Sequence, residues 1–430
     1  MERKAIEYLR KWKAKSSRKP LIVRGARQVG KTWLIKEFGK TEYLQTAYVN
    51  FESSKDLQSL FSSDFDVPRI ITALQIETGI QIDSDNTLII FDEIQEAEGG
   101  LTSLKYFQEN APEYHVIAAG SLLGVALHNT KSFPVGKVEF IDLYPLSFSE
   151  FLLAVGQKPM LDLLKSKDWA LIKTFKEKYI HLLRQYYYVG GMPEVVSSFI
   201  QENDFSEVRN IQKNILRSYE QDFSKHAPNE IVPRIRMLWD SIPAQLSKEN
   251  KKFIYGLIKK GARAKEYEIA LSWLIDCGLI YQINRVSKPG MPLKAYEDNS
   301  AFKLYIVDIG LLGAMGDIDA KTLLEGNVIF EEFKGSMTEQ YVLQQLISGF
   351  GMSVYYWSAE GGIAEVDYLI QYEGQIIPVE VKAEENLKAK SLKSYCEKYH
   401  PELAIRSSMS DYREEDWLVN VPLYVIGEYF

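Results

Sequence analysis

One glycine-rich segment near the start of the chain constrains the fold more than any other feature of the sequence. Residues 25–32 read Gly25-Ala26-Arg27-Gln28-Val29-Gly30-Lys31-Thr32, which fits the pattern Gly, four residues, Gly-Lys-Thr without a mismatch. A short apolar run precedes the segment at residues 20–24, and residues 33–38 follow it with helical spacing. Strand, glycine loop and helix together form a phosphate-binding unit, so the sequence predicts one here. A chance match in an ordinary turn is the alternative.

The loop predicts both a nucleotide and a metal ion. Its amides and the helix N-terminus point at an anion, so we expect residues 25–32 to wrap the phosphates of ATP. Lys31 is then expected to reach the β- and γ-phosphates, and the Thr32 hydroxyl to ligate Mg²⁺.

A second motif follows about 60 residues later. Residues 87–93 read Thr-Leu-Ile-Ile-Phe-Asp-Glu, an apolar strand that ends in two acids. A buried parallel strand delivers its last residues to the sheet edge where nucleotides bind. We therefore expect Asp92 to hold Mg²⁺, through water or Thr32, and Glu93 to polarise the attacking water as a catalytic residue. A strand that ends in a solvated acidic turn is the alternative.

The next apolar run, residues 115–119, ends in Gly120-Ser121. Ser121 is expected to sense the γ-phosphate or orient the water, although Gly-Ser also makes ordinary turns. Hydrolysis also needs positive charge on the leaving phosphates. The sequence does not choose among the candidates for this charge, which are Arg24, Arg27, Lys137, Arg184 and Arg217.

Composition narrows the class of protein. A chain of 430 residues predicts about two to three domains, and 46% hydrophobic with 25% charged residues is typical of globular proteins. The net charge of −7 argues against a protein that coats nucleic acid along its whole length. Cys277 and Cys396 stand far apart, which excludes a disulfide framework and suits a reducing compartment. The charged N-terminus and the absence of a long apolar run predict a cytoplasmic protein without a membrane segment.

The order of apolar runs predicts an α/β fold. A helix is expected within residues 1–20, and strands and helices alternate up to residue 150, which predicts a parallel sheet covered on both faces. The expected strands are residues 21–24, 47–51, 87–91, 115–119 and 137–143. We expect a P-loop core at 1–150, a helical lid at 151–225, a winged-helix-like domain at 226–318 and a separate α/β domain at 319–430.

The winged-helix prediction depends on two helices followed by a hairpin, residues 278–286 and 301–307. Arg263 and Lys265 precede the second helix, but a helix that reads a groove needs more exposed basic or amide side chains. A structural lid or a contact for a protein partner is the alternative to binding DNA.

Near the C-terminus, two predicted strands, residues 363–370 and 375–382, carry acids that the hairpin would bring together. Glu380 and Lys382 share one face of their strand, and Asp367 lies close to Glu380 if the hairpin closes. Carboxylates at one spot repel unless a cation such as Mg²⁺ lies between them, so Asp367 and Glu380 are candidate metal ligands. Glu339, on a preceding predicted helix, would add a third carboxylate. A surface ion pair is the alternative.

With these motifs, the sequence resembles a bacterial and archaeal family of predicted ATPases that join an AAA-type P-loop domain to a C-terminal domain of uncharacterised function. The segments that carry the resemblance are residues 21–32, 91–95, 119–123, 143–148, 190–194 and 303–312. Residues 379–382, Val-Glu-Val-Lys, match the metal-site strand of the PD-(D/E)XK nuclease-like fold, which is a restriction-endonuclease-like α/β domain.

The resemblance implies roles for residues of this chain. Lys31 and Thr32 correspond to Walker A, and Asp92 and Glu93 to Walker B. It further implies that Asp367, Glu380 and Lys382 form a nuclease-type catalytic triad, with Glu339 as a weaker helical acid. Many relatives carry Gly-Arg where this chain has Gly136-Lys137, and lysine lacks the bidentate fork of arginine.

Three functional hypotheses follow. In the first, Mg²⁺-dependent ATP hydrolysis positions a metal-dependent nuclease domain on DNA or RNA. In the second, the chain is a nucleotide-driven switch whose C-terminal domain only binds nucleic acid or a protein partner. In the third, the P-loop is a signalling module that assembles with a protein partner or with further copies of the chain.

Overall fold

The chain divides into two compact units. The N-terminal unit comprises Glu2–Tyr144 with Asp276–Gly278, and the C-terminal unit comprises Pro145–Ile275 with Leu279–Phe430. The computed structural model describes all residues except 122, 126–134, 249–250, 326–330, 360–363 and 384–388. Leu122 and Ile363, which belong to two predicted motifs, therefore lie outside the described residues.

A five-stranded sheet forms the centre of the N-terminal unit, and every strand pair in it is parallel, as predicted. The spatial order is β2-β3-β4-β1-β5. The strands are β1 Leu21–Arg24, β2 Gln45–Asn50, β3 Thr87–Asp92, β4 His115–Ala119 and β5 Glu139–Asp142. The bounds of β1 and β4 coincide with the prediction, and those of the other three strands differ from it by one or two residues.

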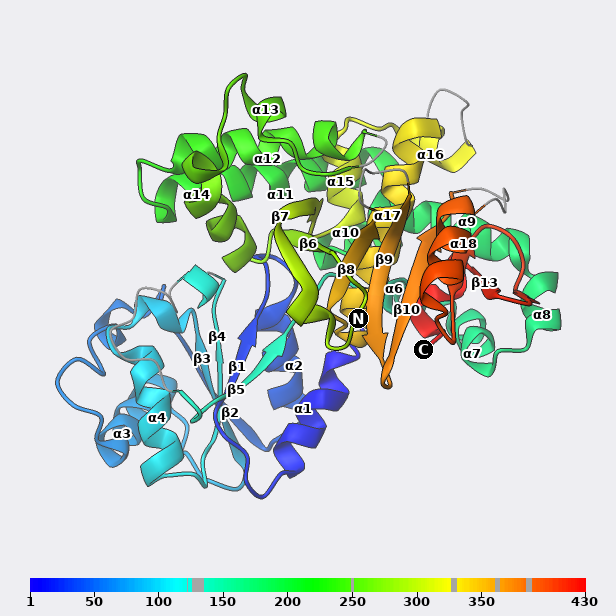
Figure 1. Ribbon diagram of the computed structural model, residues 1–430. Coiled ribbons are helices and arrows are strands. Elements are labelled where there is room, and N and C mark those ends of the chain that lie inside the picture. Colours follow the sequence, from blue (N-terminus) through cyan, green and yellow to red (C-terminus); the bar gives the residue numbers. More distant parts are fainter. Residues whose placement is uncertain (122, 126–134, 249–250, 326–330, 360–363, 384–388) are drawn as a thin grey trace. The chain divides into compact units, whose positions relative to one another are not determined.

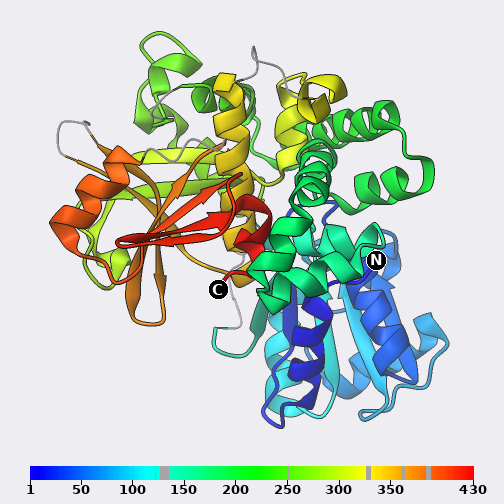
Figure 2. The same cartoon turned by 90° about the vertical axis from the view of Figure 1, so that its right-hand side faces the viewer.

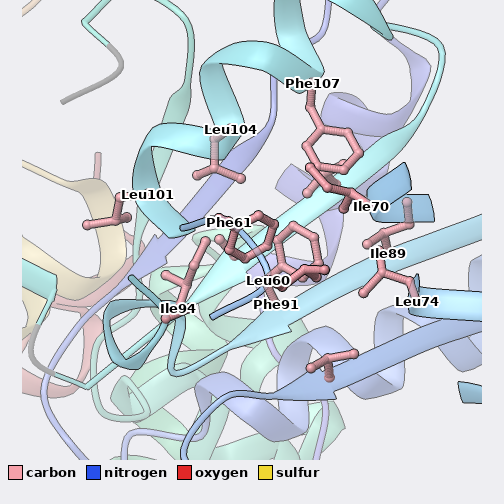
Figure 3. Packing of buried hydrophobic residues seen from close by; sticks show 14 of the residues in the cluster. Leu60, Phe61, Ile70, Leu74, Ile89, Phe91, Ile94, Leu101, Leu104 and Phe107 are labelled. Atoms are coloured by element: carbon pink, nitrogen blue, oxygen red, sulfur yellow. The ribbon is translucent and has the colours of Figure 1, made fainter. Parts of the chain in front are cut away.

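Helices cover both faces of this sheet, α1 and α2 on one side and α3 and α4 on the other (Figure 1). They span α1 Ala5–Ala14, α2 Lys31–Glu42, α3 Val67–Thr78 and α4 Gly100–Asn110. Alternate residues of β3 point to opposite faces, so Ile89 and Phe91 both pack against α3 and α4 (Figure 3). The Phe91 ring makes edge contacts with Phe51, Phe61 and Phe107 at centroid distances of 5.7, 5.8 and 5.9 Å. This apolar layer fixes β3, and with it the two acids at its end.

The C-terminal unit begins with a helical region, as predicted for residues 151–225. Its first helix starts with a capping box, in which Ser147 and Glu150 each satisfy the other's backbone amide. The predicted break is present, because α9 ends at Val189 and α10 begins at Pro193. The helices are α6 Phe148–Ala154, α7 Lys158–Ser166, α8 Trp169–Thr174, α9 Lys176–Val189, α10 Pro193–Glu202, α11 Phe205–His226, α12 Val232–Leu246, α13 Tyr255–Ile258, α14 Ala264–Asp276, α15 Ile309–Met315, α16 Ala320–Glu325, α17 Glu331–Phe350 and α18 Lys390–Tyr399.

An eight-stranded mixed sheet completes this unit, in the order β12-β13-β11-β10-β9-β8-β6-β7. Helix α17 packs against β8 and β10 on one face, and α18 packs against β9 and β10 on the other (Figure 2). The strands are β6 Ile280–Val286, β7 Glu297–Ile306, β8 Val354–Ser358, β9 Glu365–Tyr372, β10 Gln375–Val381, β11 Ile405–Ser408, β12 Arg413–Glu415 and β13 Leu418–Pro422.

The predicted hairpin of the winged-helix-like domain is present as the antiparallel pair β6 and β7. It is not a free ribbon, because β6 also pairs with β8 and so continues the sheet that carries the C-terminal acids. The second strand begins at Glu297, four residues before the predicted start at Ala301. The winged-helix assignment and the boundary at residue 318 stay predictions, but one sheet spans that boundary.

Two of the segments that carry the family resemblance meet around one buried carboxylate. Asp308 is fully buried, and its two oxygens accept the backbone N–H groups of Gly191, at 2.6 Å, and of Leu311, at 3.1 Å. Gly191 is required here, since a Cβ atom would lie 2.2 Å from the carbonyl oxygen of Leu146. Asp308 thus caps α15 and ties it to the break before α10, which is a structural role.

In the described part of the chain, no helix combines the length and the apolar character that a membrane span requires.

Candidate functional site

The glycine loop connects β1 to α2 in the N-terminal unit and has the backbone of a tight cradle. Gly25, Gln28 and Gly30 have φ of 141°, 66° and 93°. A Cβ atom on Gly25 would lie 2.2 Å from the carbonyl oxygen of Leu143, so only glycine fits there. Helix α2 begins at Lys31, directly after the loop, and its first amides therefore point toward the loop.

Lys31 lies inside this loop. The side chain is only 7% exposed, and its ammonium group donates to the carbonyl oxygens of Gly25, at 2.9 Å, and Ala26, at 2.8 Å. Burial lowers the pKa of Lys31 to about 8, against the opposing effect of Glu93 and Asp92. The cationic end of the residue is thus held at the loop by neutral acceptors that a phosphate can replace.

The predicted contact between the two motifs is present at the end of β3. The Thr32 hydroxyl donates to Oδ2 of Asp92 at 2.8 Å, so both predicted Mg²⁺ ligands are adjacent. The sequence analysis missed Tyr48, whose hydroxyl donates to the same oxygen at 2.9 Å. Tyr48 lies on β2, which pairs directly with β3, and burial raises the pKa of its hydroxyl to about 12. Its position near the end of the strand adjacent to β3 was the available signal.

Glu93 is brought together with Ser121, as the order of the motifs predicted. The Glu93 carboxylate accepts the backbone N–H of Ser121 at 3.0 Å and the Ser121 hydroxyl at 3.1 Å. Gln95 donates to the same carboxylate at 2.5 Å. Glu93 has a φ of 49°, a left-handed conformation that is uncommon outside glycine.

The candidate cations for the leaving phosphates are in different environments. Arg24 forms a bidentate pair with Asp142 at 2.9 Å, and Lys137 pairs with Glu109 at 2.9 Å. Arg27 lies in the loop itself. Arg184 donates to a backbone carbonyl, and Arg217 is exposed on α11. The geometry therefore does not single out one of the five.

The C-terminal acids are brought together, since β9 and β10 form the predicted antiparallel hairpin. Glu373 and Gly374 in the turn both have positive φ, which suits a two-residue hairpin loop. Asp367 accepts the backbone N–H of Val381 at 2.8 Å, and Lys382 lies 2.7 Å from Oε1 of Glu380. The ion pair considered as an alternative is thus present between Lys382 and Glu380, although Glu380 is only 6% exposed and the pair is not a surface one.

Burial and mutual repulsion dominate the electrostatics of these acids. Burial raises the pKa of Asp367 well above its ordinary value, and the nearby Glu339 and Glu380 raise it further. Burial also raises the pKa of Glu380, although Lys382 opposes it. Burial alone would raise the pKa of Glu339, but Lys251 and Lys303 outweigh burial and lower it.

Sequence reasoning missed two lysines of this cluster. Lys251 lies 2.6 Å from Oε1 of Glu339, and Lys303 lies 2.5 Å from Oε1 of Glu365. The Tyr305 hydroxyl donates to the other oxygen of Glu339 at 3.0 Å. A lysine in the middle of the apolar run at residues 301–307 was a signal for Lys303, whereas no pattern marked Lys251.

The two sites differ in how they fit a metal ion. Thr32 and Asp92 offer adjacent oxygens beside a phosphate-binding loop, which suits Mg²⁺ bound partly through a nucleotide. In the described residues, no group of three or more His, Cys, Asp or Glu side chains is arranged to hold a metal ion. The assignment of Mg²⁺ to Asp367 and Glu380 stays a prediction.

Comparison with family models identifies the N-terminal part of the chain. Residues 17–152 match the model of an AAA domain. These residues form an AAA domain. Residues 180–322 match a domain of unknown function (DUF8612), and residues 334–425 match another (DUF4143). The expected union of an AAA-type domain with an uncharacterised C-terminal domain is thus confirmed, whereas none of these matches describes a nuclease.

Searches of whole proteins add little to this result. No curated protein matches the chain. Among solved structures, the Walker-type ATPase of Pyrococcus abyssi is similar with 14% identity and a TM-score of 0.45, over 73% of this chain and 95% of that one. The ORC1 protein of Aeropyrum pernix, in complex with DNA, is similar with 12% identity and a TM-score of 0.28, over 73% of this chain and 90% of that one. Both TM-scores are too low to support an argument about function.

Proposed function

We propose that the AAA domain binds ATP with Mg²⁺ at residues 25–32 and hydrolyses it. The observation that carries the proposal is the contact of Thr32 with Asp92, which joins the end of the phosphate loop to the acid of β3. Glu93 and Ser121 lie next to this contact and supply the acceptor and the donor that hydrolysis needs.

Each residue has a distinct role in this proposal. The loop amides hold the β- and γ-phosphates, and Lys31 exchanges the carbonyl oxygens of Gly25 and Ala26 for phosphate oxygens. Thr32 and Asp92 would hold Mg²⁺, which neutralises the charge on the phosphates when it is bound. Glu93 orients the attacking water and accepts its proton.

Ser121 gives this site a simple control. Its hydroxyl and amide both donate to the Glu93 carboxylate and fix its orientation, while the remaining lone pairs of the carboxylate can accept a proton from water. A γ-phosphate that draws the Ser121 hydroxyl toward itself would let the Glu93 carboxylate turn toward the attacking water. This exchange links γ-phosphate binding to the availability of the base.

Steady-state ATP hydrolysis tests the proposal. Lys31→Ala is expected to lower the rate at least about a hundredfold, because the lysine stabilises charge on the transferred phosphate. Lys40→Ala, an exposed lysine on the same helix, is the matched control and keeps the wild-type rate. Wild-type protein that hydrolyses no ATP with Mg²⁺ present, or a Lys31→Ala variant with full activity, would contradict the proposal.

For the C-terminal unit, we infer a nucleotide-driven switch whose sheet binds nucleic acid or a protein partner without cutting it. The competing hypothesis is a metal-dependent nuclease that uses Asp367, Glu380 and Lys382. The lysines beside the acids support the switch, because they already supply the positive charge that a nuclease-type site takes from its metal ion.

Incubation of the full chain with DNA or RNA, ATP and either Mg²⁺ or Mn²⁺ separates the two hypotheses. The switch predicts intact nucleic acid under every condition, with the same result for Glu380→Ala. Cleavage by the wild-type protein that disappears in Asp367→Ala and Lys382→Ala would establish the nuclease instead.

A further inference from the structure

The charged cluster around Glu339 contains more cations than the sequence motif accounts for. Glu339 comes from α17, Glu365 and Asp367 from β9 and Glu380 from β10. Carboxylates this close repel one another, and a cation between them relieves the repulsion. The motif provides one cation, Lys382. The structure adds Lys251 and Lys303, both of which act on Glu339.

We propose that Lys251 and Lys303 take the place of a divalent metal ion in this cluster, which is therefore a metal-free charged core. The proposal does not depend on ATP hydrolysis by the N-terminal unit. It concerns what the C-terminal unit binds, and it explains why its acids are stable together.

Each of three lysines pairs with a different carboxylate of the cluster. Three acids of the cluster each have a lysine within 2.5–2.7 Å. The pairs are Lys251 with Glu339, Lys303 with Glu365 and Lys382 with Glu380. Three separate ammonium groups thus neutralise three carboxylates, and the remaining acid, Asp367, accepts a backbone amide.

A metal ion would have to displace these lysines, but both side chains are buried. Lys303 is 1% exposed and Lys251 is 9% exposed. The Lys303 ammonium lies 4.9 Å from the centre of the Tyr356 ring, so the space beside it is aromatic rather than aqueous. An ammonium group that loses its carboxylate while buried costs several kcal/mol, which offsets the gain from binding the metal.

One carboxylate oxygen of the cluster has no hydrogen-bond partner among the described residues. This oxygen is Oε2 of Glu380, and it is buried. A single free carboxylate oxygen does not make a Mg²⁺ site, because the ion requires near-octahedral coordination by oxygen. It does make Glu380 the residue to test for metal binding.

The two lysines come from outside the predicted C-terminal domain. Lys303 lies on β7, and Lys251 lies between α12 and α13, whereas the predicted domain begins at residue 319. The resemblance of residues 379–382 to a nuclease strand could not reveal them. The acid cluster is completed by a neighbouring segment that pairs with the same sheet.

Mn²⁺ binding to the nucleotide-free full chain tests the proposal. Electron paramagnetic resonance reports the concentration of unbound Mn²⁺. The measurement is made in an Asp92→Asn background, so that the N-terminal site does not contribute. We expect Glu380→Gln to leave Mn²⁺ binding unchanged, because no ion is bound at the cluster. The proposal would be overturned if the Asp92→Asn protein binds Mn²⁺ and the Asp92→Asn/Glu380→Gln double variant does not.

Removal of a lysine is a second test of whether the lysines take the place of a metal ion. Lys303→Met removes one internal cation, so Mn²⁺ is expected to raise the unfolding temperature of this variant and not that of the wild type. A variant that Mn²⁺ does not stabilise would contradict the role given to Lys303. If Lys303→Met does not fold, the Glu380→Gln comparison decides. ATP hydrolysis measured on the wild type separates failure of the proposed ATPase from failure of this inference.

Discussion

The molecule has two acid sites that differ in what faces the carboxylates. At the end of β3, Asp92 and Glu93 accept from neutral donors, which are the Thr32 and Tyr48 hydroxyls and the Ser121 hydroxyl and amide. In the C-terminal unit, Glu339, Glu365 and Glu380 face ammonium groups instead.

The donors around a carboxylate decide whether it can bind a further cation. Neutral donors orient a carboxylate and leave its charge in place, so the site retains affinity for an ion that arrives with a nucleotide. Ammonium groups cancel the charge within the fold, so the site loses that affinity, and removal of one partner leaves an uncompensated charge. Two acid motifs that look alike in a sequence can therefore have opposite functions.

The largest expected effect comes from comparing Glu93, which follows β3, with Glu380, which lies near the end of β10. Glu93→Gln is expected to slow ATP hydrolysis about a thousandfold while nucleotide still binds, because the amide cannot accept a proton from water. Glu380→Gln is expected to leave hydrolysis unchanged. Single-turnover hydrolysis and nucleotide binding measured on both variants check the prediction, and equal losses would remove the distinction between the sites.

The next effect is on stability. Lys303→Met is expected to lower the free energy of unfolding by about 3 kcal/mol, because it removes a buried cation that pairs with Glu365 and also acts on the buried Glu339. Lys40→Met on the surface of α2 is the matched control, with an expected change below about 0.5 kcal/mol. Urea unfolding of both variants provides the measurement. Equal stability of the two variants would show that the Lys303 pair does not hold the cluster together.

Tyr48→Phe tests whether the Tyr48 hydroxyl positions Asp92 in the N-terminal site. The ring stays and the hydroxyl that donates to Asp92 is lost, so we expect the Mg²⁺ concentration for half-maximal ATP hydrolysis to change about threefold, equivalent to under 1 kcal/mol. The maximal rate at saturating Mg²⁺ should stay within about twofold. A lower maximal rate with the same Mg²⁺ dependence would assign Tyr48 a role other than positioning Asp92.

Asp367→Asn is expected to have the smallest effect. Burial raises the pKa of Asp367 well above its ordinary value, and an amide of the same shape can still accept the backbone N–H of Val381. We expect the free energy of unfolding to change by less than about 1 kcal/mol, as measured by urea titration. Asp92→Asn, by contrast, should abolish Mg²⁺-dependent hydrolysis. A strong loss of stability in Asp367→Asn would mean that a charged Asp367 is required.

The fold was largely predictable because its signals are local. The spacing of residues 25–32 and the apolar runs before Asp92 and Ser121 each specify one strand and its end, and parallel strands deliver their ends to one edge of a sheet. The hairpin of β9 and β10 was predictable for the same reason, since its turn and its alternation are contained in about 20 residues.

The partners of the acids were less predictable because they come from distant segments. Tyr48 contacts Asp92 only because β2 pairs with β3. Lys251 reaches Glu339 across 88 residues of sequence, and no spacing rule links them. The β6–β7 pair was predicted as the hairpin of a winged-helix-like domain, and only the pairing of β6 with β8 shows that it extends the C-terminal sheet.

The decisive measurement is the number of Mn²⁺ ions bound per chain in the presence of a non-hydrolysable ATP analogue. We expect one ion, which depends on the nucleotide and is lost in Asp92→Asn. Two ions per chain, the second of which is retained in Asp92→Asn and lost in Glu380→Gln, would contradict this expectation.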